Sequence, residues 1–287
     1  LGPYRVIAEH LRQRPLGVDV AAVFLAVAVF VALASTVGYV LSFSGFRLTR
    51  HSGGTLHVNR GLLTSRATSI ERRRLRGVEL SEPLLLRAVG GARCLAVATG
   101  LRVGRGAERG GEILLPPAPA AEAIRVGSLV LQTPAPMTVP LVSHPAIALR
   151  RRVVRAVAGA CVFSGAFDAV VLVAHWPRWL LALTGVFVSV AVALGHDRYH
   201  SLGHAFTHGY VVSRFGSLVR RRTALAADGV IGWNVRSTYF QRRLGLTTLV
   251  ATTAAGRQKY PVADIAATDA VRFADSCVPG LLTEFLT

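Results

Sequence analysis

The stretch that decides the fold spans residues 153–194 and has the sequence VVRAVAGACVFSGAFDAVVLVAHWPRWLLALTGVFVSVAVAL. It contains two apolar runs of about 18 to 20 residues, close to the length that a helix needs to cross the hydrocarbon core of a bilayer. Only residues 175–178 separate the runs, so the two helices should form an antiparallel hairpin. Trp176 and Trp179 lie at its tip, where aromatic rings favour the membrane interface, and Pro177 helps to end the first helix. The alternative is a buried helical pair in a large soluble core.

A hairpin returns the chain to its starting side, so the residues before 150 and after 198 must share one side of the membrane. Upstream, no charged residue lies between Asp19 and Arg47, which predicts a single span over residues 18–45. Arginines flank the region between this span and the hairpin, and arginine-rich loops stay in the cytoplasm. They are Arg47, Arg50, Arg60 and Arg66 on one flank and Arg150, Arg151, Arg152 and Arg155 on the other, against Arg5, Arg12 and Arg14 before the span. The hairpin itself should occupy residues 150–198.

Composition also favours a membrane protein. Hydrophobic residues make up 52% of the 287 residues and charged residues only 17%, which departs from the usual balance of soluble domains. The formal charge of +18 comes almost wholly from arginine, with Lys259 as the sole lysine. Such a charge follows from loop orientation in a membrane as well as from nucleic-acid binding. Cys94, Cys161 and Cys277 are far apart in the sequence and form neither a metal-ligand cluster nor an obvious disulfide framework.

The N-terminal residues 1–17 form a polar lead-in to the first span. The chain begins at Leu1 rather than at methionine, so an upstream portion is expected to be missing. The first long apolar run is too long for a secretory signal peptide and follows an arginine-bearing segment.

Short segments rich in valine, leucine and threonine, punctuated by glycine, lie outside the apolar runs and are typical of a curled antiparallel sheet. They occur in residues 46–132 and again in residues 199–287. In both regions the strands come first and one closing helix comes last. Residues 133–149, between the first region and the hairpin, are rich in proline and predict a semi-rigid linker without regular structure.

The two strand-rich regions are interpreted as copies of one unit. They align without a gap at an offset of 154 residues, which pairs Arg60 with Arg214, Arg66 with Arg220, Gly91 with Gly245, Leu95 with Leu249 and Thr99 with Thr253. In each copy proline is expected to introduce the closing helix: Pro116 and Pro117 in the first, Pro261 in the second. Identity is low, so the alternative is chance similarity of two small β units, and the shared order of elements is the stronger argument.

The sequences FRLTRHSGGTLHVNRGLLTSRATSIERRRLRGVEL (residues 46–80) and GYVVSRFGSLVRRRTALAADGVIGWNVRSTYFQRRLGLTTLVATTAAG (residues 209–256) resemble bacterial pleckstrin-homology-like (PH-like) domains of the YdbS/YdbT-like membrane proteins. The marks are a strand followed by Arg-Gly-Leu-Leu or Arg-Phe-Gly, an arginine-rich return strand, and the turn at residues 240–245. The resemblance implies a curled seven-stranded sheet closed by a C-terminal helix, pairs of membrane helices between domains, and no catalytic site. Residues 86–89 depart from the pattern, because the polar pair Gln241 and Arg242 has no counterpart there.

We therefore expect an α+β membrane protein with three transmembrane helices, one single span plus one hairpin, and two PH-like domains. It should be a multi-pass protein of the bacterial plasma membrane with both PH-like domains in the cytoplasm.

The densest positive clusters are candidates for binding anionic lipid or a partner protein. Arginines near a bilayer attract anionic headgroups by about 1 kcal/mol each and bind phosphate in a bidentate manner. The alternative is a solvated basic face that only sets orientation. The clusters lack the interleaved aromatic residues of a nucleic-acid platform, so no nucleic acid is expected. The candidates are Arg72, Arg73, Arg74, Arg76, Arg220, Arg221, Arg222, Arg242 and Arg243.

Asp168 is the one acid inside an expected span. A carboxylate at mid-bilayer is costly, so Asp168 should face protein and accept a hydrogen bond from a neighbouring helix, with a proton or ion path as the alternative. His196, His200, His204 and His208 recur every four residues, which is metal-ligand spacing on a continuous helix. Glycines near them favour a passage from helix into strand instead, which would scatter the rings into a polar collar.

No nucleophile–base arrangement and no nucleotide or zinc-hydrolase motif is visible, and the glycine-rich residues 100–111 lack the Lys-Ser/Thr of a phosphate loop. The sequence thus predicts a non-enzymatic interaction or assembly scaffold of the bacterial envelope, without cofactor, metal or small-molecule substrate. Its partners would be membrane lipids and another membrane protein or a second copy of the chain. The alternative is a transport or envelope-stress component, protective against antimicrobial peptides, that uses intramembrane Asp168.

Overall fold

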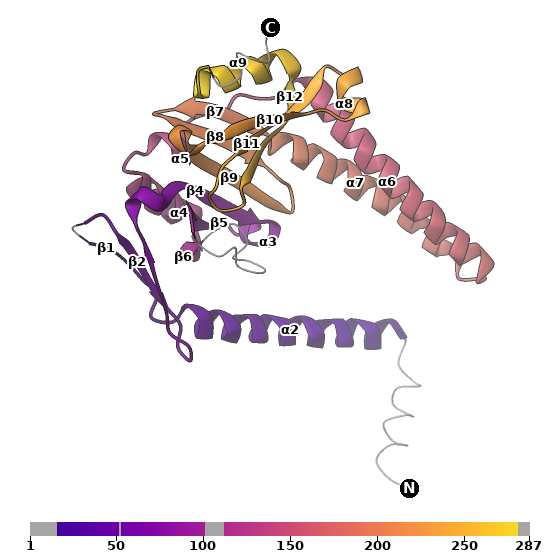
Figure 1. Cartoon of the computed structure of the whole chain (residues 1–287). Helices are drawn as coiled ribbons and strands as arrows, with labels where there is room; N and C mark the ends of the chain where they lie inside the picture. The colour runs from indigo at the N-terminus through magenta and orange to yellow at the C-terminus, as the bar shows by residue number, and fades with distance from the viewer. Residues whose placement is uncertain (1–15, 52, 101–111, 281–287) are drawn as a thin grey trace. The chain divides into compact units, whose positions relative to one another are not determined.

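The computed structural model describes residues 16–51, 53–100 and 112–280 (Figure 1). Within them, three helices are long and apolar enough to cross a membrane: α2 (Leu16–Phe43), α6 (Ala146–Val173) and the segment Arg178–His200, which comprises η3 (Arg178–Ala182) and α7 (Leu183–His200). The expected single span and hairpin are confirmed. The expected lead-in at residues 1–17 and the glycine-rich loop fall almost wholly outside the described residues.

The chain divides into two compact units, Leu1–Ser69 and Ile70–Thr287, with the boundary inside the first PH-like region. In the first unit, α2 is followed by a three-stranded sheet of β1 (Arg47–Arg50), β2 (Leu56–Arg60) and β3 (Arg66–Ile70). The β2–β3 turn is fastened to the end of α2, because the backbone N–H of Gly61 donates to Ser44 O and that of Leu62 donates to Leu41 O, both at 3.0 Å.

The second unit is built on a six-stranded antiparallel sheet in the order β6-β5-β4-β9-β8-β7. Its strands are β4 (Leu75–Pro83), β5 (Gly91–Ala98), β6 (Glu112–Pro119), β7 (Gly203–Thr207), β8 (Tyr210–Phe215) and β9 (Val219–Ala226). The central pairing, from Gly77↔Leu225 to Pro83↔Val219, joins strands from both sequence copies. Gly77 is required there, since a Cβ would lie 2.1 Å from Ala224 O. One continuous sheet therefore links the two PH-like regions.

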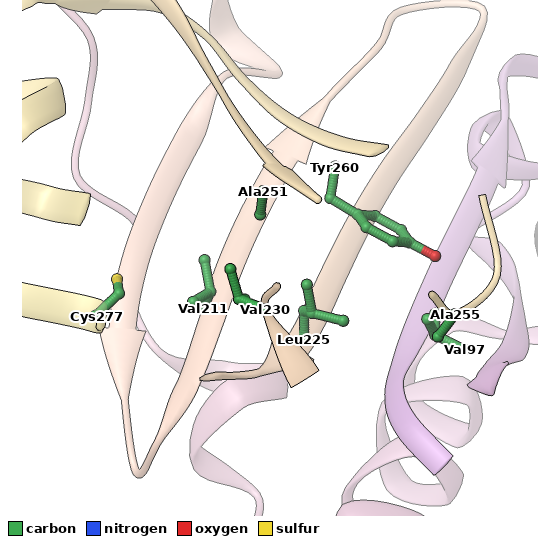
Figure 2. Close-up of a cluster of buried hydrophobic side chains, with 8 residues drawn as sticks. All are labelled: Val97, Val211, Leu225, Val230, Ala251, Ala255, Tyr260 and Cys277. Carbon is green, nitrogen blue, oxygen red and sulfur yellow. The ribbon is translucent and has the colours of Figure 1, made fainter. Parts of the chain in front are cut away.

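A three-stranded sheet of β10 (Gly232–Arg236), β11 (Leu246–Thr252) and β12 (Lys259–Ala266) completes the second copy, followed by α9 (Ala267–Cys277). Figure 2 shows the core between the two sheets, with Val211 and Leu225 from the large sheet facing Ala251 and Tyr260. Val97 of β5 belongs to the same buried cluster. The first copy thus contributes apolar surface to the core of the second.

The remaining short elements lie at equivalent places in the two copies. The first copy has η1 (Arg72–Arg74), α3 (Leu84–Ala88) and α4 (Ala120–Leu131), and the second has η4 (Ala227–Gly229), α8 (Tyr239–Arg243) and α9. We call β1–β6 with α3 and α4 copy one, and β7–β12 with α8 and α9 copy two.

The structure corrects the alignment of the copies by one residue. Gly90 and Gly245 both have positive φ, and both accept a hydrogen bond through their carbonyl oxygen from the first residue of the closing helix, so the offset is 155 up to β5 and β11. For β6 and β12 and for α4 and α9 it is 147. The fold class and the repeat are confirmed, with six strands in copy two rather than the seven that the resemblance implied.

The prolines expected to begin the closing helices lie inside strands instead. Pro116 and Pro117 belong to β6 and Pro261 to β12, and α4 and α9 begin at Ala120 and Ala267. Both strands are at sheet edges, where a residue without an N–H is tolerated. The proline-rich residues 133–149 are not wholly irregular, because they contain α5 (Ala135–Thr138) and the start of α6.

Candidate functional site at the base of the membrane hairpin

Asp264 attaches copy two to the first helix of the hairpin. It lies in a β-bulge of β12, where the pairing shifts between Thr247 and Leu249 and the φ angle of Asp264 is 60°. A bulge redirects a side chain out of the ladder. The carboxylate accepts from Arg151 Nη1 at 2.6 Å and from Arg152 Nε at 2.7 Å, with the three side chains only 2%, 12% and 14% exposed. Asp264 and the two arginines thus form a buried ion-pair anchor to α6.

Gln241 brings α8 into the same anchor. Thr238 and Gln241 form a capping box, in which the Gln241 side-chain oxygen accepts from the Thr238 backbone N–H at 3.0 Å. The side-chain amide nitrogen of Gln241 donates to Asp264 Oδ1 at 2.8 Å. The short helix is thereby held against β12 and, through Asp264, against the base of α6.

Asp197 attaches copy one to the second helix of the hairpin. It lies near the end of α7 and accepts from Arg87 of α3 at 3.0 Å, from Arg220 of β9 at 3.3 Å and from the Ser217 hydroxyl at 2.7 Å. The side chains of Asp197 and Arg87 are 28% and 19% exposed, so water screens this contact more than the Asp264 anchor. Copy two therefore contacts both helices of the hairpin, whereas copy one reaches α7 through Arg87.

Glu79 is a buried carboxylate where the copies join. It lies on β4 opposite Thr223 of β9, 3.3 Å from Arg221 Nε and 3.3 Å from Arg257 Nη2. Burial raises the pKa of the Glu79 carboxyl, and the charges of Arg257 and Arg221 oppose that rise. A buried carboxylate of one copy is thus paired with two arginines of the other.

A cavity of about 390 Å³ lies beside the start of α6 and is lined by His144, His204, Asp269, Arg272 and Phe273 among others. His204 Nδ1 lies 3.1 Å from His144 Nε2, and His144 Nδ1 lies 3.1 Å from Asp264 O, so the pair adjoins the Asp264 anchor. Burial lowers the pKa of both imidazoles, that of His204 to about 4. Both rings are therefore neutral at pH 7.

Three of the predicted binding arginines serve internal contacts. Arg220 contacts Asp197, Glu82 and Ser201, Arg221 contacts Glu79, and Arg222 donates to the carbonyl oxygens of Pro136 and Val139. Burial lowers the pKa of Arg222 to about 10. These three side chains are partly buried and take part in the packing of β9 against its surroundings.

The other predicted arginines are more accessible. Arg72, Arg73 and Arg74 form η1 and are exposed, with Arg73 and Arg74 beside Glu71, while Arg76 pairs with Asp228 of η4. Arg242 and Arg243 on α8 are exposed, and Arg243 lies over the ring of Tyr239 at 5.0 Å. The exposed arginines among the predicted residues thus lie on two separate elements, η1 and α8.

The polar residues of the hairpin have local partners. Asp168 accepts from the Thr184 hydroxyl of α7 at 2.7 and 2.9 Å, the neighbouring-helix contact expected for it. His196 and His200 lie together on α7, their rings tilted by 55° with centroids 4.3 Å apart, whereas His204 lies on β7 and His208 in the following turn. The expected passage from helix into strand is confirmed and separates His204 and His208 from the pair on α7, but His196 and His200 stay together, with their Nε2 atoms 2.8 Å apart. Within the described residues no group of three His, Cys, Asp or Glu side chains could hold a metal ion.

Sequence reasoning missed the residues at the base of the hairpin: Arg87, His144, Asp197, Gln241 and Asp264. One signal was present. The chain has 15 acidic residues against 33 lysines and arginines, and Asp264 stands alone within an apolar strand. An isolated acid in such a strand is rarely buried unless it is paired, so an arginine partner could have been expected.

A family model described as the bacterial PH domain matches residues 14–152 and, a second time, residues 152–277. The first match includes α2 and the second begins within α6, and each includes one copy of the strand-rich unit. No curated protein and no solved structure matches the chain.

Proposed function

Because the chain belongs to the bacterial PH domain family, a relationship that covers residues 14–277, we propose that it is a non-enzymatic scaffold of the bacterial plasma membrane. Its PH-like copies would lie in the cytoplasm and bind another membrane protein. The proposal assigns the chain no cofactor and no small-molecule substrate.

The observation that carries this proposal is the six-stranded sheet shared by the two copies. The β4–β9 ladder, together with Glu79 and its two arginines, holds strands β4–β6 of copy one and β7–β9 of copy two in one body within the second unit. Asp264 and Asp197 then fix this sheet to both helices of the hairpin. A rigid body held at a set height above the membrane suits a protein that positions partners.

The exposed arginines of η1 are the partner surface that we assign. Arg72, Arg73 and Arg74 are consecutive and exposed, and Arg73 and Arg74 form ion pairs with Glu71. Three adjacent guanidinium groups complement an acidic surface and raise the association rate with it. We therefore expect the partner to present clustered carboxylates.

The partner surface is tested by affinity isolation of the full chain from native membranes after crosslinking. Replacing Arg72, Arg73 and Arg74 together by glutamate should reduce recovery of the crosslinked partner at least tenfold. The matched control replaces Arg125 and Arg272, exposed arginines that form i,i+3 pairs with Glu122 and Asp269, and should leave recovery unchanged. Equal recovery from both variants would contradict the assignment.

The orientation is tested by cysteine labelling in intact cells. Cys94 and Cys277 are buried, so replacing Cys161 by alanine leaves a background with little reactivity. A cysteine at His175, at the tip of the hairpin, should react with a membrane-impermeant maleimide, and one at Asp275 of α9 should react only after permeabilisation. The opposite labelling order would place the PH-like copies outside the cytoplasm.

A further inference from the structure

The short helices α3 and α8 expose large apolar side chains. On α8, Tyr239 and Phe240 are 54% and 70% exposed. On α3 and its C-terminal cap, Leu85 and Val89 are 84% and 80% exposed. Clustered exposed apolar groups mark surfaces that contact something apolar.

Both short helices are fastened to the base of the hairpin. Gln241 of α8 donates to Asp264, which binds the two arginines at the start of α6, and Arg87 of α3 donates to Asp197 near the end of α7. In Figure 1, α3 and α8 lie on the side of the sheets from which the hairpin projects. The exposed apolar groups are therefore next to the point where the chain enters the membrane.

The position of charges along α6 and α7 gives the depth of these contacts. No charged residue lies between Arg178 and Asp197, so Asp197 marks the level at which α7 leaves the hydrocarbon. On α6 the last arginine is Arg155, and Arg152 precedes it by about 4.5 Å along the helix axis. Each headgroup layer is about 5 to 7 Å deep. The contacts that hold α3 and α8 thus lie at headgroup depth.

The two short helices differ in charge. Arg242 and Arg243 are exposed on α8, and Arg243 lies over the Tyr239 ring, an arrangement suited to headgroup phosphates above and acyl chains below. On α3 the only arginine is Arg87, which is paired with Asp197. The exposed Leu218 of the β8–β9 turn adjoins α3, since the Leu84 N–H donates to Leu218 O at 2.7 Å. The α3 surface is therefore apolar.

Within the first unit, exposed apolar side chains also lie beside the end of a membrane helix. The β2–β3 turn, hydrogen-bonded to the last turn of α2, exposes Leu62 and Leu63 at 59% and 81%. Exposed apolar side chains thus lie beside each end of a membrane helix that a turn or a short helix contacts.

We propose that α8, and α3 together with Leu218, lie in the interface of the bilayer that the hairpin spans, with their apolar side chains among the upper acyl chains. Arg242 and Arg243 bind phosphate groups of anionic lipid, whereas the α3 surface inserts without regard to lipid charge. The proposal requires that the chain spans a membrane, but it does not depend on the scaffold role or on η1.

The test uses the full chain, purified and reconstituted without any partner, in the Cys161→Ala background. A single environment-sensitive fluorophore is attached to Phe240→Cys, to Leu85→Cys or to the control Leu129→Cys, an exposed apolar position on α4. Vesicles of phosphatidylcholine, with and without phosphatidylglycerol, contain a lipid nitroxide that quenches from within the bilayer. Iodide quenches from the water.

Probes at positions 240 and 85 should be quenched severalfold more by the lipid nitroxide, and severalfold less by iodide, than the probe at 129. Phosphatidylglycerol should increase nitroxide quenching at 240, the double change Arg242→Gln and Arg243→Gln should remove that increase, and quenching at 85 should respond to neither. Iodide quenching at 240 and 85 equal to that at 129 would overturn the membrane contact. Equal quenching at 240 with and without phosphatidylglycerol would overturn the role of the two arginines.

Discussion

The two copies form the same β-bulge and place different residues in it. In copy two the bulge of β12 against β11 holds Asp264, and in copy one the equivalent shift between Ala92 and Cys94 places Pro117 at the corresponding position. A proline has no charge with which to bind the hairpin. Copy one instead uses Arg87 of α3, one element away, to reach α7.

This difference shows that a repeated bulge can bind the hairpin in one copy and not in the other, because the contact depends on the side chain at one position of the bulge. The Asp264 anchor is buried, carries two arginines and adjoins the histidine pair. The Asp197 anchor is partly open to water. We therefore expect copy two to be bound to the hairpin more tightly than copy one, and the following changes test that ranking.

The largest effect is expected for Asp264→Ala. Removing this carboxylate leaves Arg151 and Arg152 as buried cations without their partner, which typically costs about 3 to 5 kcal/mol. Thermal unfolding of the detergent-solubilised protein should shift to markedly lower temperature. The control Asp269→Ala, which removes a half-exposed acid of α9 paired with the exposed Arg272, should shift it little. Similar shifts in the two variants would show that the Asp264 anchor contributes no more to stability than a half-exposed ion pair.

An intermediate effect is expected from pH, through His204. The folded-state pKa is lowered to about 4, so protons bind the unfolded chain more readily between that value and about 6.5. Stability should be complete above about pH 6.5 and fall as the pH drops toward 4, by up to about 3 kcal/mol. The groups that face this imidazole are His144, Asp269, Arg272 and, beyond His144, Asp264 and Arg152.

The pH effect is measured by unfolding the protein at a series of pH values. His204→Gln should flatten the dependence in that interval, whereas His208→Gln, at an exposed turn, should retain it. Hydrogen exchange at pH 5 should show greater opening of β12 and the start of α6 than of α3. Uniform opening of both anchors would remove the distinction between the copies.

The spans and most strands were predictable because they depend on local pattern: long uncharged runs for α2, α6 and α7, and Val- and Thr-rich segments for the sheets. The pairing of β4 with β9 was not, because the two strands are about 140 positions apart in the sequence and the pattern of neither strand specifies its neighbour. The internal contacts of Arg220, Arg221 and Arg222 were not predictable either. Their partners Glu79, Glu82 and Asp197 are distant in sequence.

The smallest effect is expected for Asp197→Asn, which tests the weaker anchor. Asparagine still accepts from Ser217 but loses the charge opposite Arg87 and Arg220, and a partly exposed ion pair contributes about 1 kcal/mol or less. Because salt screens exposed charges far more than buried ones, the loss should shrink in high salt, while that of Asp264→Ala should persist. A double-mutant cycle of Arg87→Gln with Asp197→Asn should give a coupling energy below 1 kcal/mol. A coupling as large as the whole Asp264→Ala effect would reverse the ranking and make α3, rather than α8, the firmer attachment to the membrane helices.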